Sequence, residues 1–188
     1  MRWLILHARS RQVPVSAAAV ALVALALRAL GGPEPASLGT VVLVLTANVA
    51  AASVGLGGWD PALERTAAIR WAPRRAAHVL LIGAVASAAL LAVQATGARL
   101  APAEVVIRTS AGLVGLAALG AALFGAQLAW ILPTGWLGFT LLMPPPGGVV
   151  GEVVGWMVYS PSTTVSTATP WALLAAGTVV YAAAGPRG

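Results

Sequence analysis

Residues 103–125, AEVVIRTSAGLVGLAALGAALFG, decide the fold class of this protein. The only charged side chains in this stretch are those of Glu104 and Arg108, and every residue after Arg108 is apolar, small or hydroxylated. A helix that crosses the hydrocarbon core of a bilayer needs about 20 mostly apolar residues. The stretch meets this requirement, so it predicts a transmembrane helix.

The rest of the chain has the same apolar character. Of its 188 residues, 59% are hydrophobic and 9% are charged, whereas soluble domains carry roughly 25% charged residues. This composition excludes a soluble globular protein and predicts an all-α polytopic membrane protein, with residues 1–188 forming a single transmembrane domain. Six apolar stretches are predicted to span the bilayer, at residues 14–31, 37–58, 76–97, 103–125, 126–143 and 169–184.

The sequence contains neither cysteine nor lysine. The absence of cysteine excludes disulfides, thiolate metal sites and thiol catalysis in this chain. A Walker A loop places its lysine on the nucleotide phosphates, so any ATP hydrolysis on which the protein depends must come from another chain. The formal net charge of +6 is typical of cytoplasmic loops that retain arginine, and we expect no nucleic-acid partner.

The arginines predict the orientation of the chain in the bilayer. If both termini are cytoplasmic, more arginines lie on the inner side than on the outer side, as the positive-inside rule requires. The inner set is Arg2, Arg9, Arg11, Arg65, Arg70, Arg74, Arg75 and Arg187, and the outer set is Arg28, Arg99 and Arg108. We therefore expect a membrane protein with an amphipathic lead-in at residues 1–13 and both termini inside.

The main loop predicted on the inner side is WDPALERTAAIRWAPRR, residues 59–75. Asp60 is a preferred N-cap residue and Pro61 a preferred first helical residue. The loop therefore predicts a short cytoplasmic helix within residues 60–72, and we expect this helix to stop before Pro73.

This predicted helix has an apolar stripe that includes Leu63 and Trp71, and its charged residues Glu64, Arg65 and Arg70 point away from the stripe. A short helix of this kind is typical of an interfacial element on the membrane surface. It is equally typical of a docking site for a cytoplasmic partner, and physical chemistry alone does not separate the two interpretations.

Residues 144–168 form an unusual segment between the last two predicted spans. PPPGG at its start breaks any helix, and the apolar piece VVGEVVGWMVY that follows is shorter than a span. We therefore expect an external re-entrant or interfacial segment rather than a seventh span. A charge at bilayer depth costs about 2.5 to 3.5 kcal/mol, so Glu152 lies near the surface, faces a cavity or is protonated.

Few side chains in the sequence could carry out catalysis. His7 and His78 belong to no metal-binding pattern, and no nucleophile elbow occurs. We therefore expect no enzymatic activity, no cofactor and no metal site. Glu104 and Arg108 stand four residues apart and predict an exposed ion pair, with a substrate contact as the alternative.

Pro133 lies between Trp130 and Trp136 in the predicted span 126–143. A proline inside a helix removes a hydrogen bond and commonly produces a kink, so we expect a kink at this position. Pro133, Trp136 and Glu152 are therefore the candidate residues of a substrate path or gate.

The whole layout resembles the membrane subunit of type-2 ABC exporters, the ABC-2 permease class. MRWLILHARSRQ matches the amphipathic lead-in of that class, DPALERTAAIRWAPRR its coupling helix between spans two and three, and PPPGGVVGEVVGWMVY its external re-entrant piece. LERTAAIR, LAWILP and the closing VYAAAGPR are similar to small permeases encoded beside ABC ATPases in actinomycetes.

The resemblance implies a permease subunit that exports an amphipathic or hydrophobic compound in the lipid bilayer. It implies two ABC ATPase subunits and a second permease subunit, in a homodimer or a heterodimer, as partners. The residues that would transmit ATPase motion are Leu63, Glu64, Arg65, Arg70 and Trp71. The alternatives are a non-transporting structural or regulatory membrane subunit and, as the least favoured, a membrane-embedded enzyme.

Overall fold

The computed structural model describes residues 37–56, 71–97, 100–143, 146–159 and 163–186. Within these ranges every regular element is helical. The elements are α3 (Leu38–Ser53), the 3₁₀ turn η1 (Val54–Leu56), α5 (Trp71–Ala95), α6 (Ala103–Phe124), the 3₁₀ turn η2 (Ala126–Leu128), α7 (Ile131–Leu142), α8 (Gly148–Val154) and α9 (Thr164–Ala184).

Three helices in the described part of the chain, α5, α6 and α9, are long and apolar enough to cross a membrane. Helix α3 and the stretch Ala126–Leu142 are also apolar but shorter. Length and composition therefore confirm an all-helical, membrane-associated architecture for the described residues. The predicted lead-in at 1–13 and the predicted span at 14–31 lie outside these residues.

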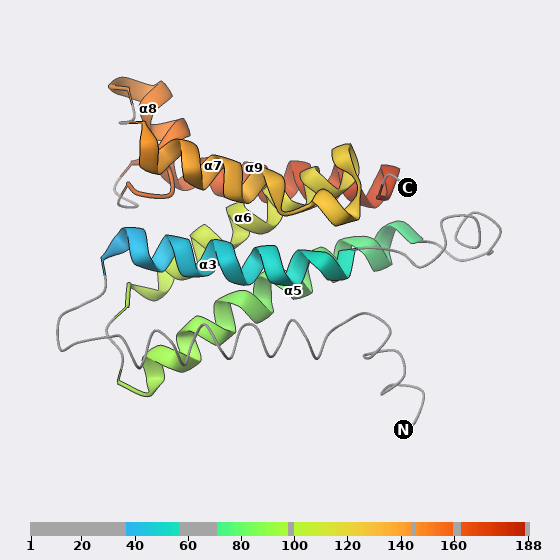
Figure 1. Cartoon of the computed structure of the whole chain (residues 1–188), viewed down its shortest axis with the longest axis horizontal. Coiled ribbons are helices and arrows are strands. Elements are labelled where there is room, and N and C mark those ends of the chain that lie inside the picture. The colour runs from blue at the N-terminus through green and yellow to red at the C-terminus, as the bar shows by residue number, and fades with distance from the viewer. Residues whose placement is uncertain (1–36, 57–70, 98–99, 144–145, 160–162, 187–188) are drawn as a thin grey trace.

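The five longer helices run along a common long axis, and α8 lies at one end of them (Figure 1). This end, which we call the α8 end, also holds the start of α3, the end of α7 and the start of α9 (Figure 1). Helix α6 is the central element because it contacts α3, α5, α7 and α9, and its contact with α9 is the most extensive in the structure.

Small residues explain why α6 and α9 pack so closely. A Cβ atom added to Gly115 of α6 would overlap the backbone carbonyl of Leu173 in α9, and a Cβ added to Gly177 of α9 would overlap the carbonyl of Gly115. The two backbones are therefore in direct contact at this crossing. Close approach of this kind maximises dispersion contacts in a medium where burial of apolar surface contributes little.

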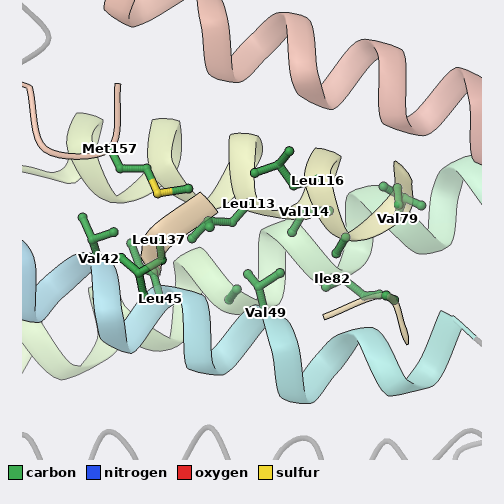
Figure 2. Packing of buried hydrophobic residues seen from close by; sticks show 14 of the residues in the cluster. Val42, Leu45, Val49, Val79, Ile82, Leu113, Val114, Leu116, Leu137 and Met157 are labelled. Carbon is green, nitrogen blue, oxygen red and sulfur yellow. The ribbon is translucent and has the colours of Figure 1, made fainter. Parts of the chain in front are cut away.

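The core lies between α3, α5 and α6. Figure 2 shows side chains of α3, including Val42, Leu45 and Val49, that point toward α6, where Leu113 and Val114 are almost fully buried. These apolar contacts hold the described helices together.

Two helices begin earlier than the sequence predicts. Helix α5 begins at Trp71 rather than at residue 76. Pro73 is the third residue of α5, and a proline in the first turn is tolerated because its missing N–H would have no intrahelical partner there. Trp71 and Ala72 therefore belong to α5, whereas residues 60–70 of the predicted coupling helix lie outside the described residues.

Helix α9 begins at Thr164 rather than at residue 169. Thr163 is its N-cap, and the Thr163 hydroxyl accepts a hydrogen bond of 3.2 Å from the backbone N–H of Ser166. Pro170 is consequently inside the helix, where it is buried. The polar residues at the start of α9 are helical and capped, not an extended turn.

The predicted span 126–143 is divided into η2 and α7 in the structure. Pro133 lies in the first turn of α7 and is buried. A proline at this position follows the start of the helix and does not interrupt it. Pro133 therefore lies at the start of a helix rather than in the middle of a continuous one.

Candidate functional site at the α8 end

The segment that follows α8 turns back into the bundle at residues 155–159. Backbone hydrogen bonds from Val158 N and Tyr159 N to the Gly155 carbonyl, of 2.9 and 3.1 Å, form the turn. Trp156 and Met157 are fully buried. An apolar piece too short to span thus folds inward and contributes the largest buried side chain among the described residues.

Arg108 of α6 holds this turn through its guanidinium group. Its Nη2 donates hydrogen bonds of 3.2 Å to the Trp156 carbonyl and 2.8 Å to the Tyr159 carbonyl. The side chain is only 3% exposed. The expectation of an exposed ion pair with Glu104 is therefore wrong, because Arg108 is buried and bonds carbonyl groups of the 155–159 turn.

Trp136 of α7 holds the adjoining end of α8. Its indole Nε1 donates a hydrogen bond of 2.9 Å to the Val154 carbonyl. This carbonyl belongs to the last residue of a short helix, where backbone acceptors lack intrahelical donors. The predicted gate residue Trp136 thus caps the end of α8.

The indole of Trp156 fills the space between α6 and α9. A Cβ atom on Gly112 would lie 2.8 Å from Trp156 Cζ2 and 2.8 Å from the Cβ of Pro170. Gly112 is therefore the residue of α6 that makes room for the ring. Helices α6, α7 and α9 together hold the segment 148–159, through Arg108, Trp136 and the Gly112–Pro170 contact.

Several donors at this site have no partner among the described residues. Arg108 Nε and Nη1 and Trp156 Nε1 are buried without a hydrogen bond. Guanidinium and indole groups donate and cannot accept. The α8 end therefore contains a buried site that is rich in hydrogen-bond donors.

The predicted path or gate residues are only partly brought together. Glu152 lies in α8, half-buried, two residues before the carbonyl that Trp136 binds. Pro133 lies in the first turn of α7, away from the end of that helix where α8 lies. The structure thus groups Glu152 with Trp136 and leaves Pro133 apart.

Of the predicted coupling residues, only Trp71 is among the described residues. Its ring centroid is 5.9 Å from the guanidinium carbon of Arg74, which is cation–π geometry. Leu63, Glu64, Arg65 and Arg70 lie outside the described residues.

Two side chains bind the carbonyls that precede the predicted coupling loop. His78 Nε2 of α5 is 3.1 Å from the Gly55 carbonyl, and the Tyr181 hydroxyl of α9 donates a 2.6 Å hydrogen bond to the Leu56 carbonyl. Both acceptors are in η1, immediately before residues 57–70. The end of α3 is therefore joined to α5 and α9 at the end of the bundle opposite the α8 end.

Trp156 is the site residue that sequence reasoning missed, and Arg108 was singled out but assigned to an ion pair with Glu104. An arginine one turn into an otherwise apolar span is costly at membrane depth. That cost indicates that Arg108 has a hydrogen-bond partner inside the protein. It does not indicate which partner, because the carbonyls of Trp156 and Tyr159 lie 48 and 51 residues further along the chain.

Comparisons with protein-family models, with curated proteins and with solved structures give no match to this chain. Within the described residues, no group of three or more His, Asp or Glu side chains is placed to hold a metal ion. The function must therefore be argued from the geometry and from the topological resemblance.

The Trp136 hydrogen bond can be tested by Trp136→Phe, which keeps most of the ring and removes the N–H. We expect a loss of stability of about 1 kcal/mol, because the Val154 carbonyl loses its donor. Thermal unfolding in detergent measures the loss. Trp171→Phe is the control, because Trp171 is 46% exposed; equal losses in the two variants would show that the hydrogen bond contributes nothing.

Proposed function

We propose that this protein is the permease subunit of a type-2 ATP-binding-cassette exporter in the bacterial cytoplasmic membrane. It has six spans with both termini cytoplasmic, and it moves an amphipathic or hydrophobic compound outward. ATP is hydrolysed by separate ATPase chains, and a second permease subunit completes the complex.

The observation that carries the proposal is the attachment of both flanks of residues 57–70 to the bundle. The N-terminal flank ends in η1, whose carbonyls are bound by His78 and Tyr181. The C-terminal flank continues directly into α5, which contacts α6 and α9. A force applied to this loop by an ATPase would therefore reach α5, α6 and α9, as a coupling element requires.

The α8 end supports the same proposal from the opposite side of the bundle. Segment 148–159 is short, is partly inserted between helices and lies between α7 and α9. An external re-entrant segment has this position in the exporter class that the sequence resembles. Movement of the spans would alter the Arg108 and Trp136 contacts and so open or close this end.

The first test uses the double substitution Glu64→Ala and Arg70→Ala. We expect the variant to fold normally and to lose export, because the charged face that meets the ATPase is gone. Co-purification with the ATPase and export of a fluorescent amphiphile from cells are measured together. If the variant co-purifies with the ATPase and exports normally, the coupling assignment is refuted. If the wild-type chain forms a stable complex with the ATPase but never exports, the protein is a structural or regulatory subunit.

The second test removes one hydroxyl, by Tyr181→Phe. We expect the ATPase to remain bound while the transport rate falls about fivefold, since the lost hydrogen bond to Leu56 is worth about 1 kcal/mol. Tyr159→Phe is the matched control, because Tyr159 contributes its backbone carbonyl to the Arg108 contact. If transport is unchanged in Tyr181→Phe, the end of α3 does not transmit the motion.

A further inference from the structure

We propose that the α8 end binds the anionic head group of an amphiphile, held by Arg108 Nε and Nη1 and by the indole N–H of Trp156. The ligand class is an oxyanion, phosphate or carboxylate, attached to an apolar chain. This inference is independent of transport, since the site could hold a membrane lipid or a free amphiphile in a protein of any function.

The first argument is the chemistry of the unsatisfied groups. Arg108 Nε and Nη1 and Trp156 Nε1 are all buried, and none has a partner among the described residues. Buried polar groups in native proteins are almost always hydrogen-bonded. Because these three atoms are all donors, only an acceptor can satisfy them.

The second argument is the position of the donors on α6. Arg108 and Gly112 are four residues apart and therefore share one face of the helix, about 6 Å apart along its axis. The Trp156 ring lies directly over Gly112. The guanidinium and the indole thus lie within about one helical turn of each other, close enough for one head group to meet both.

The third argument is charge. The guanidinium stays charged at any relevant pH, and the two carbonyls that bind Nη2 carry no net charge. Glu104 is exposed and interacts with Arg108 electrostatically, and Glu152 is half-buried, but neither carboxylate is a hydrogen-bond partner of Arg108 among the described residues. An oxyanion would satisfy the donors and neutralise the charge together, and bidentate binding of oxyanions suits arginine.

The fourth argument concerns the apolar part of the ligand. The same end of the bundle exposes large apolar side chains from the end of α7 and the start of α8: Leu142 (85%), Met143 (56%), Val149 (64%) and Val150 (64%). An acyl chain lying along these residues would cover apolar surface while its head group reached Arg108. Because the donors are buried, binding requires the packing around them to open.

The experiment measures binding of dodecyl phosphate to the full-length protein in dodecyl maltoside, by the rise in Tm with ligand concentration. We expect dodecyl phosphate to stabilise the wild type and dodecyltrimethylammonium to have no such effect. Trp156→Phe keeps the ring over Gly112 and removes one donor, and we expect about tenfold weaker binding. Trp171→Phe, on an exposed ring, is expected to bind as the wild type does.

Two further arms distinguish the source of the oxyanion. If it is a lipid phosphate, vesicles of phosphatidylglycerol will stabilise the wild type more than vesicles of phosphatidylcholine, and Trp156→Phe will reduce the difference. If it is a free amphiphile, dodecyl phosphate will stabilise the protein equally in both kinds of vesicle. Inorganic phosphate is expected to bind at least tenfold more weakly than dodecyl phosphate, since it lacks the apolar chain.

Two results would overturn the proposal. One is a wild type that no anionic amphiphile stabilises, in detergent or in vesicles. The other is equal affinity of wild type and Trp156→Phe for dodecyl phosphate, which would place the binding elsewhere. Arg108→Gln should also lose binding, and if that variant does not fold, Trp156→Phe decides alone.

Discussion

Gly115→Leu is expected to prevent α6 and α9 from packing, with a loss of at least about 3 kcal/mol in the free energy of unfolding. The added side chain would collide with the backbone of Leu173, which cannot move without displacing the whole of α9. Rotamer changes cannot relieve a collision with backbone. We expect poor accumulation in membranes and, for any purified protein, a Tm lower by about 10 °C.

The matched control is Gly135→Leu in α7. Gly135 is also a helical glycine, but a Cβ atom at this position would meet nothing within 4 Å. The same substitution there is expected to leave accumulation and Tm nearly unchanged. Equal behaviour of the two variants would show that α6 and α9 do not cross at Gly115 and Gly177.

Arg108→Met is expected to release the 155–159 turn from the bundle. The substitution leaves the carbonyls of Trp156 and Tyr159 without their donor. The cost is about 1 to 3 kcal/mol for the buried contact to Trp156 and less for the partly buried contact to Tyr159. Removal of the buried charge of Arg108 offsets part of this cost in the free energy of unfolding of the whole protein. The local effect remains, so we expect faster opening of the turn even if the Tm changes little.

A single cysteine at Met157 measures this opening, because the natural chain contains no cysteine and Met157 is fully buried. In the Met157→Cys background, Arg108→Met is expected to raise the rate of maleimide labelling at least tenfold, which corresponds to about 1.4 kcal/mol. Glu104→Gln in the same background is the control and is expected to leave the rate unchanged. A larger effect of Glu104→Gln would restore the ion pair as the main partner of Arg108.

The fold was predictable where one strong apolar pattern covered a whole element. Residues 103–125 predicted a helix that the structure places at Ala103–Phe124, because the apolar run ends at a glycine with positive φ. Two helix starts were predicted too late, at residues 76 and 169, whereas α5 begins at Trp71 and α9 at Thr164. Pro73 and Pro170 lie inside these helices, because a proline is acceptable in a first turn or where tertiary packing compensates for the lost hydrogen bond.

The candidate site was predictable only as a region. The shortness of the apolar piece at 149–159 set it apart from the spans, and Glu152 and Trp136 were selected as unusual residues. Arg108 was assigned to a local pair with Glu104, because spacing along a helix shows only which neighbours on the same helix can meet. Its hydrogen-bond partners come from another segment and leave no periodic signal in the sequence.

The sequence by itself determined an apolar, all-helical, membrane-associated chain, because transfer of side chains from water to lipid depends mainly on composition and length. Only the tertiary structure decided that α6 is the central helix, that Gly115 meets Gly177, and that Arg108 binds the 155–159 turn. Those outcomes depend on which helices lie side by side. Hydrogen bonds and backbone contacts act over a few ångströms, so they form between residues that are distant in the chain only after packing has brought them together.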